Sequence, residues 1–113
     1  MGSSMSRITT HVLDGVLGRP VIGISIRLEA ARGDAWTLVR NGTTDEDGRC
    51  RDLASNAERG RYRLVFVTGS YMQQKGRATI YPEVAVVFEC DGAGHYHLPL
   101  LLSDNSYTTY RGC

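Results

Sequence analysis

Apolar and polar residues alternate along much of this chain, and each alternating segment predicts a β-strand. From Val21 to Glu29, four aliphatic side chains at every second position share one face, while small or charged residues lie between them. This is the pattern of a half-buried strand. Tyr62, Leu64 and Phe66 repeat it and predict a strand over Arg61–Thr68. Further strands are predicted over Arg7–Asp14, Trp36–Thr43, Glu83–Glu89, His95–Leu102 and Ser106–Arg111.

The segments between these strands carry turn signals and one short helix. Asp45–Gly48 predicts a tight acidic turn whose glycine adopts a positive φ, and Asp91–Gly94 predicts a hairpin turn. Ser70–Gly76 predicts a helix that is capped by its first residue and ended by its last, whereas Leu53–Arg59 favours a helical turn only weakly. The Val-rich strand Glu83–Glu89 is expected to be buried on both faces. Seven to eight short strands with one short helix predict an all-β fold, a two-sheet sandwich.

Histidines and leucines occupy opposite faces of the predicted strand near the C-terminus. Successive side chains of a strand point to opposite sides of the sheet, so His95 and His97 project from one face. The other face carries Leu98, Leu100 and Leu102. By the same geometry, His11 in the first strand lies on the face opposite Ile8 and Val12. The solvent-facing side of a strand usually carries hydrated, replaceable side chains. Two imidazoles on one such face are therefore an unusual polar set.

Length and charge exclude several classes of protein. The 113 residues fit one domain, and the net charge of +1 comes from Lys and Arg that are scattered singly. A nucleic-acid-binding protein would show a basic stripe, so nucleic acid is not expected as a partner. No apolar stretch has the length needed to span a membrane, and a membrane partner is not expected either.

Cysteine usage and the opening residues bear on the compartment. Three cysteines are too few, and odd in number, for a disulfide framework, and their spacing is not that of metal ligands. This usage predicts a reducing compartment, and we expect the cytoplasm. The opening, residues 1–5, has the appearance of a disordered cloning remnant, with residues 6–113 as a single domain. A periplasmic or peroxisomal location stays open if a targeting segment once preceded residue 6.

Motifs in a fixed order connect the chain to a known family. They are TTHVLD at 9–14, GRP at 18–20, TDEDGRC at 44–50, YPEV at 81–84, HYHLPLLLS at 95–103 and TYRG at 109–112. Together they resemble the 5-hydroxyisourate hydrolases, the transthyretin-related family of purine breakdown. The resemblance runs from about residue 7 to the end, and separated motifs in the right order are far more specific than one motif alone.

The resemblance implies a fold, a reaction and an assembly. It implies a transthyretin-like (prealbumin) sandwich that assembles as a homotetramer, with sites in a channel at the dimer–dimer interface. The implied reaction, in urate degradation, is hydrolysis of 5-hydroxyisourate to 2-oxo-4-hydroxy-4-carboxy-5-ureidoimidazoline, without a cofactor. The matched catalytic residues are His11, Arg49 and His97. The matched substrate-binding residues are Tyr110, Arg111, Gly112 and Cys113.

These residue types suit the addition of water to a ring carbonyl. A histidine has an unperturbed pKa of about 6.5, so His11 and His97 can exchange protons near neutral pH. A guanidinium at Arg49 disfavours protonation of nearby imidazoles and offers planar donors to the oxygens of an oxidised purine. Which histidine is the base and which is the acid stays open. His95 is expected to be structural or to line the site.

The chain departs from the family pattern at its end and in one loop. The family ends in Ser, whereas this chain ends in Cys113, and Asp104–Asn105 stand where Pro and an aromatic residue are usual. The thiol can replace a hydroxyl that orients substrate or water, with reduced activity. Alternatively, Cys113 is a nucleophile and the reaction passes through a thioester. We favour the first reading because the implied scheme uses an activated water.

Other classes of function remain open at this stage. A transthyretin-like carrier would hold a hydrophobic ligand in the same channel, but it would need apolar side chains where this chain has histidine and arginine. An unspecialised β-sandwich interaction module would make the polar set a coincidence. A zinc site on His11, His95 and His97 lacks an obvious fourth ligand. Cys50 and Cys90 are most simply small buried hydrophobic residues.

Overall fold

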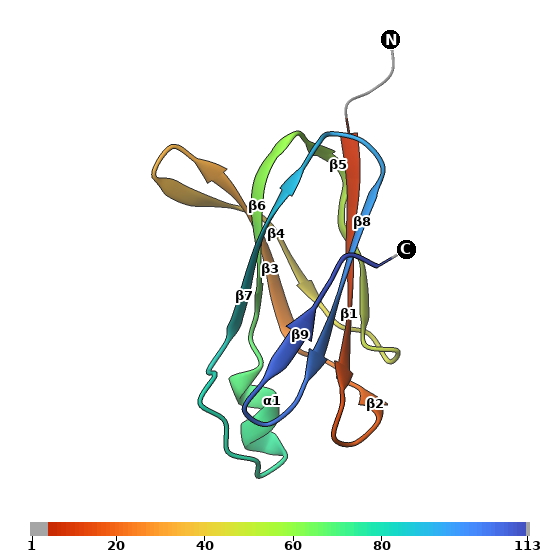
Figure 1. Cartoon of the computed structure of the whole chain (residues 1–113), viewed down its shortest axis with the longest axis vertical. Coiled ribbons are helices and arrows are strands. Elements are labelled where there is room, and N and C mark those ends of the chain that lie inside the picture. Colours follow the sequence, from red (N-terminus) through yellow and green to blue (C-terminus); the bar gives the residue numbers. More distant parts are fainter. Residues whose placement is uncertain (1–4, 113) are drawn as a thin grey trace.

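Two β-sheets pack face to face in the computed structural model, which describes residues 5–112 (Figure 1). The first sheet contains β1 (Met5–Asp14), β2 (Arg19–Pro20), β5 (Arg49–Glu58), β8 (His95–Leu102) and β9 (Tyr107–Thr109). The second contains β3 (Ser25–Arg32), β4 (Ala35–Thr43), β6 (Gly60–Phe66) and β7 (Val84–Cys90). The helix α1 (Gly69–Gln74) lies at one end of the sandwich (Figure 1). The predicted all-β sandwich is therefore confirmed, with nine strands in the described part of the chain.

Strand β1 is the centre of the first sheet. It pairs in parallel with β8 on one side, and on the other side it pairs antiparallel with β5 and, at its C-terminal end, with β2. Strand β9 extends the sheet beyond β8. The second sheet runs β4-β3-β6-β7 with antiparallel neighbours throughout. Segments far apart in the sequence therefore meet on β1.

The core lies between the two sheets and is made by every second residue of the strands. Burial of these aliphatic and aromatic side chains is the main stabilising contribution, at roughly 25 cal/mol per Å² of apolar surface. Among those with no exposed surface are Ile8, Val12, Ile26, Leu28, Leu64, Phe66 and Leu100. Cys50 and Cys90 lie in the same core as free thiols, as predicted. Burial raises the pKa of Cys90 to about 11, so this thiol stays protonated.

The predicted strand from Val21 to Glu29 is wrong in its first half. Strand β3 begins only at Ser25, because Gly23 has a φ of +77° and turns the chain. Val21 is buried, whereas Ile22, expected in the core, is 57% exposed. The backbone of this segment is held by hydrogen bonds to the neighbouring strands' ends, from Val21 N–H to the Val12 carbonyl and from Gly23 N–H to the Thr44 carbonyl.

Two further corrections concern the strands at the sheet edges. The segment expected to favour a helical turn, Leu53–Arg59, is extended and belongs largely to β5, because it pairs with the first half of β1. The segment expected to be buried on both faces, Glu83–Glu89, forms β7 with one open face, and Val87 is 54% exposed. Strand β7 is the edge of the second sheet, and only one of its faces meets the core.

The connections differ from expectation at two points. Asp91–Gly94 is not a hairpin turn, because β7 and β8 belong to different sheets and this segment crosses between them. Helix α1 has Thr68 rather than Ser70 at its N-cap, without a side-chain hydrogen bond to the helix end. Its predicted stop is confirmed, since Gly76 has a φ of +66°.

The opening expected as a remnant, residues 1–5, lies outside the described residues except for Met5, with which β1 begins. The helix present in residues 5–112 is too short to cross a membrane, and no other helix is found there.

Candidate active site

The outer face of the first sheet gathers the polar side chains that the strand pattern predicts. On β8, His95 and His97 project outward, while the leucines at alternate positions are buried in the core. On β1, Thr9 and His11 alternate with the buried Ile8, Thr10 and Val12 and lie on the same side of the sheet as the two histidines of β8. On β5, Arg49 projects outward next to the buried Cys50. Three strands from distant parts of the sequence therefore contribute to one surface.

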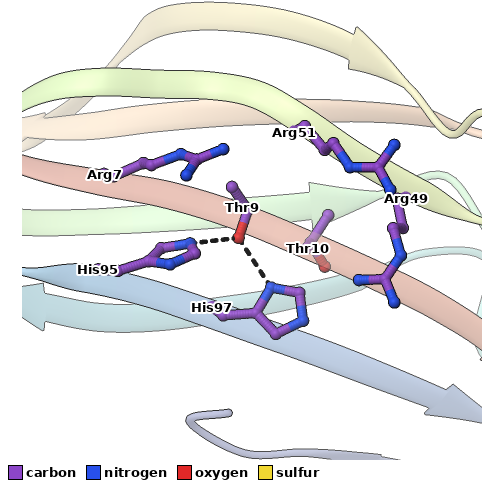
Figure 2. Close-up of a pocket in the computed structure, with 7 residues that line it drawn as sticks. All are labelled: Arg7, Thr9, Thr10, Arg49, Arg51, His95 and His97. Atoms are coloured by element: carbon purple, nitrogen blue, oxygen red, sulfur yellow. Dashed lines mark hydrogen bonds between the residues drawn. The ribbon is translucent and has the colours of Figure 1, made fainter. Parts of the chain in front are cut away.

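A pocket of about 150 Å³ opens on this face (Figure 2). Its lining combines guanidinium, imidazole and hydroxyl groups, with no carboxylate among the described residues that form it. Arg49 and Arg51 lie at one end, Arg7 and His95 at the other, and Thr9 between them (Figure 2). The full lining is Arg7, Thr9, Thr10, Arg49, Arg51, His95 and His97.

The acidic turn before β5 fixes the position of Arg49. The Asp45 carboxylate accepts hydrogen bonds from the backbone N–H groups of Asp47 and Arg49, both at 2.9 Å. Gly48 has the predicted positive φ, +75°, and its carbonyl accepts a hydrogen bond from Val12 N–H at 2.8 Å. Arg49, the first residue of β5, is thus held next to β1 by a turn with little conformational freedom. Its guanidinium therefore lies at the pocket.

Replacing Gly48 by alanine should destabilise the protein and reduce any activity that needs Arg49. A Cβ there would lie 2.5 Å from the Val12 carbonyl oxygen and 2.9 Å from the Pro20 Cβ, in a left-handed conformation. We expect a loss of at least about 2 kcal/mol in the free energy of unfolding, measured by urea denaturation. Gly33→Ala is the matched control, because its φ is +62° and nothing lies within 4 Å of the added Cβ. An equal loss in both variants would contradict the close approach at Gly48.

His11 lies beside Arg49, in a depression that adjoins the pocket. The two residues are register partners in the antiparallel pairing of β1 and β5. Arg49 and Arg51 line both hollows, whereas His11 lines only the adjoining one. The Nε2 atom of His11 is 2.8 Å from the carbonyl oxygen of Asp47, and since a carbonyl only accepts, this nitrogen is the donor. In neutral His11 the free lone pair is therefore on Nδ1.

His97 is half-buried and is held through one of its two ring nitrogens. Its Nδ1 lies 2.7 Å from the hydroxyl of Thr9, and the same hydroxyl lies 2.7 Å from Nε2 of His95. Figure 2 shows the other ring nitrogen of His97 directed toward the end of the pocket where Arg49 lies. Burial lowers the pKa of His97, and positive charge on His95, Arg49 and His11 lowers it further.

Sequence reasoning missed four pocket residues, which are Arg7, Thr9, Thr10 and Arg51. Three of them lie an even number of positions from a predicted site residue on the same strand, so strand periodicity places them on its face, whereas Thr10 is adjacent to His11 and has no such signal. That signal was available, but it becomes meaningful only when the pairing of β1 with β5 and β8 is known. The carboxylate of Asp45 lies 3.2 Å from the Arg51 guanidinium and partly balances this positive surface.

The C-terminal tail passes close to His97. The N–H of Gly112 donates to the His97 carbonyl oxygen at 2.7 Å, and a Cβ on Gly112 would lie 2.9 Å from Cδ2 of that imidazole. The Arg111 guanidinium stacks over the Tyr96 ring, with its carbon 4.0 Å from the ring centroid, and is not part of the pocket lining. Tyr110 is exposed and also lies outside the lining. Cys113 lies outside the described residues, and the binding roles of the tail stay predictions.

A metal centre finds little support in this geometry. Among residues 5–112, no three His, Cys, Asp or Glu side chains are placed to hold a metal ion. The nitrogens that a zinc ion would need on His95, His97 and His11 are in part engaged with Thr9 and the Asp47 carbonyl. The alternative of a zinc site on these histidines is not favoured in the described part of the chain.

Comparison with known proteins gives consistent matches over nearly the whole chain. The model of the HIUase/Transthyretin family matches residues 8–112. A 5-hydroxyisourate hydrolase of Mus musculus is 41% identical over 117 residues, covering 99% of each chain. One of Mesorhizobium japonicum is 44% identical over 115 residues, covering 94% of this chain and 91% of the relative.

Solved structures of two kinds share the fold. The 5-hydroxyisourate hydrolase of Klebsiella pneumoniae superposes with a TM-score of 0.83 at 32% identity, covering 96% of this chain and 100% of that one. Sea bream transthyretin in complex with thyroxine superposes with a TM-score of 0.89 at 32% identity, covering 94% of each chain. The fold is thus shared by a hydrolase and by a protein that binds a hormone, and the lining of the site has to distinguish them.

Proposed function

The chain belongs to the HIUase/transthyretin family, and we propose that it is the enzyme that hydrolyses 5-hydroxyisourate in urate degradation. Water adds to a ring carbonyl, the lactam opens, and the product is 2-oxo-4-hydroxy-4-carboxy-5-ureidoimidazoline. The observation that carries the proposal is the lining of the pocket, in which His97 and Arg49 meet beside His11. Amide hydrolysis needs a base, an acid and a positive group for the developing oxyanion, and this set supplies all three.

In the proposed mechanism, His97 takes the proton from the attacking water. Its lowered pKa keeps it neutral at pH 7, and when its Nδ1 donates to Thr9, Nε2 is the nitrogen that accepts the proton. The Arg49 guanidinium stabilises negative charge on the carbonyl oxygen in the transition state. His11, next to Arg49, supplies a proton to the leaving ring nitrogen from Nδ1 of its protonated form, since its Nε2–H is held by the Asp47 carbonyl. No step requires a cofactor.

A carrier function is less well supported. A carrier of a hydrophobic ligand needs a pocket lined mainly by apolar side chains. Here three guanidiniums and two imidazoles line the pocket, and charged groups of this kind are poor neighbours for an apolar ligand because they lose hydration. The likeness to transthyretin therefore supports the fold, whereas the lining supports hydrolysis.

The activity can be tested with urate and urate oxidase. Urate oxidase generates 5-hydroxyisourate, whose transient ultraviolet signal decays slowly by itself. We expect the purified protein to accelerate this decay in proportion to its concentration, with heat-denatured protein as the control. Decay at the spontaneous rate over a wide range of protein concentration would contradict the proposed reaction.

The lowered pKa of His97 makes the activity resistant to mild acid. The base has to be neutral in the free enzyme, so kcat/KM should fall on the acid side only below the ordinary histidine range. We expect the midpoint of the acid-side decline of kcat/KM to lie below the ordinary histidine value of about 6.5. A midpoint above the ordinary histidine value would contradict the assignment of His97 as the base.

Cys113 is expected to orient substrate or water and not to attack the carbonyl. Cys113→Ser restores the usual family terminus, so its kcat should equal or exceed that of the chain itself. Mass spectrometry of the enzyme quenched during turnover should show only the unmodified mass. A covalent adduct that disappears in Cys113→Ser, with a loss of activity, would establish the thioester route instead.

We also propose the assembly and the compartment that the family resemblance implies. The pocket lies on the outer face of the first sheet, and Leu101, on the same face of β8 as His97, is 43% exposed. An exposed apolar side chain on this face supports a homotetramer in which the face borders a channel between dimers. Light scattering of the full chain would test the homotetramer.

We propose the cytoplasm as the compartment, which the buried free thiols of Cys50 and Cys90 support.

A further inference from the structure

The hydroxyl of Thr9 occupies an unusual position between two histidines. Thr9 lies on the outward-facing side of β1, yet it is only 4% exposed. It is the register partner of His97 in the parallel pairing of β1 and β8, and His95 lies two residues earlier on the same face. Its Oγ1 is 2.7 Å from Nε2 of His95 and 2.7 Å from Nδ1 of His97 (Figure 2). Both distances are those of strong hydrogen bonds.

The chemistry of a hydroxyl restricts what this bridge can be. Threonine has one hydroxyl hydrogen, so Thr9 can donate to only one of the two rings and must accept from the other. If Thr9 donates to His95, then His97 carries its hydrogen on Nδ1, and neutral His97 has a free lone pair on Nε2. If Thr9 donates to His97, then His95 donates from Nε2, and neutral His97 carries its hydrogen on Nε2. The first arrangement makes His97 a base and the second makes it an acid.

We propose that Thr9 is a positioning residue that joins His95 and His97 into one proton-holding pair, in which His95 stores the proton that His97 removes from water. The proposal rests on the proposed hydrolysis and adds a role for two residues to it. From the sequence, His95 is expected to be structural or to line the site, and nothing in the motif assigns a role to Thr9. In this pair, Thr9 acts through His97 and does not itself touch the reacting atoms.

The proton balance of the pair is complete without any other group. His97 begins with hydrogen on Nδ1 and accepts the water proton on Nε2. The Nδ1 hydrogen then passes to Thr9 Oγ1 as the Thr9 hydrogen passes to Nε2 of His95. His97 is left neutral with hydrogen on Nε2, and His95 carries the positive charge. The reverse shift returns the proton to Nε2 of His97, which releases it to solvent after the lactam has opened, while His11 takes up a proton from solvent, and the starting arrangement is restored.

The surroundings limit the pair to one additional proton. A second positive charge on the pair would lie among like charges, which disfavours it. The charged or titratable groups that face the pair come from β1, β5 and the C-terminal tail. They are Arg7, His11, Arg49, Arg51 and Arg111, whose guanidinium lies 3.3 Å from the His95 carbonyl oxygen. Moving the charge from His97 to His95 carries it from a half-buried ring to an exposed one, away from Arg49 and toward Arg7 (Figure 2).

The test compares three variants in the urate oxidase assay. Thr9→Val keeps the shape but removes the hydroxyl, Thr9→Ser keeps the hydroxyl, and His95→Gln keeps a polar side chain that cannot take up a proton. We expect Thr9→Val and His95→Gln each to lower kcat by about tenfold or more, with KM within about threefold. Thr9→Ser should retain kcat within about threefold of the unmodified protein.

The double variant distinguishes a relay from two separate effects. Thr9→Val combined with His95→Gln should be no slower than the slower single variant, because either change breaks the same path. Multiplying losses, or a Thr9→Val kcat within about twofold of the unmodified protein, would overturn the proposal. If Thr9→Val does not fold, His95→Gln decides alone, and an unchanged kcat there overturns the proposal as well.

A measurement without substrate separates this proposal from the proposed function. In ¹⁵N-labelled protein, the ring nitrogen shifts of His97 report which nitrogen carries hydrogen. We expect its tautomer to change as His95 is protonated, and this dependence should be lost in Thr9→Val and kept in Thr9→Ser. A His97 tautomer that is independent of Thr9 would overturn the coupled pair, even if hydrolysis of 5-hydroxyisourate were established.

Discussion

Replacing His97 by alanine should slow the hydrolysis of 5-hydroxyisourate by at least about a hundredfold, since loss of a general acid–base group usually has an effect of that size. The side chain is half-buried at the pocket and its only polar partner among the described residues is Thr9. Thr9 keeps its hydrogen bond to His95 in the variant, so no buried polar group is left without a partner. Thermal unfolding should therefore change little while the rate falls.

Arg49→Ala should show a loss of similar size for a different reason. Removing a positive group that faces a developing oxyanion typically lowers kcat by about 10²–10³-fold. Arg49 is positioned through its backbone by Asp45, so the turn should persist without the guanidinium. Initial rates in the urate oxidase assay would measure both variants, with Leu38→Ala, exposed on β4 of the second sheet, as the control. Near-normal turnover of either variant would remove that residue from the mechanism.

The side of the sheet on which the histidines lie was predictable because it is a local property. Alternation along β8 places His95 and His97 opposite the core leucines, and the structure confirms this. The turn at Gly48 was predictable for the same reason, since an Asp–Gly sequence with a positive φ is decided within a few residues. Motif order added what periodicity lacked, that His97 and Arg49 meet in one pocket.

The members of the pocket that were missed depend on non-local pairing. Arg7 and Thr9 reach the site because β1 runs parallel to β8, some 88 residues further along the chain, and Arg51 because β5 pairs with the other edge of β1. Neither pairing is a hairpin with a turn signal that marks its register. The prediction of a hairpin turn at residues 91–94 was wrong for a related reason, because a glycine-rich turn can equally connect strands of two different sheets.

The second large effect concerns Asp14, a fully buried carboxylate at the end of β1. It accepts hydrogen bonds from the backbone N–H groups of Val16 and Leu17, both at 3.0 Å, and from the Tyr71 hydroxyl at 2.7 Å. It also forms an ion pair with Arg77. Arg77 in turn donates to Asp104 at 2.7 Å, in the connection between β8 and β9. This cluster joins β1, helix α1 and the β8–β9 connection.

Replacing Arg77 by methionine should lower the free energy of unfolding by about 3–5 kcal/mol at pH 7, because it leaves a buried carboxylate without its counter-ion. The matched control is Asp104→Asn, which removes the other carboxylate that Arg77 binds. The Asp104 side chain is 44% exposed, so its loss should be at most about 1 kcal/mol. Urea denaturation measures both, and equal losses would show that burial of Asp14 is not the source of the effect.

The pH dependence provides an independent check on the same cluster. Burial alone would raise the pKa of Asp14, but the hydrogen bonds from Arg77, Leu17, Tyr71 and Val16 outweigh it and hold the pKa at about 2. The unfolded chain, with a carboxyl pKa near the ordinary value of 3.8, takes up the proton first as the pH falls. The contribution of Asp14 to the free energy of unfolding is therefore complete above about pH 5. It declines by about 2–3 kcal/mol as the pH falls toward 2.

In Arg77→Met the sign of this contribution should reverse. Without the guanidinium, burial dominates and raises the pKa of Asp14 above its unfolded value, so protonation at low pH relieves the buried charge. The folded variant then binds protons more readily than its unfolded chain, and acidification favours folding at this site. The stability difference between the two proteins should accordingly be largest at pH 7 and should narrow as the pH falls from about 5 to about 3. A difference that stays constant over that range would mean that Asp14 and Arg77 do not form a coupled buried pair.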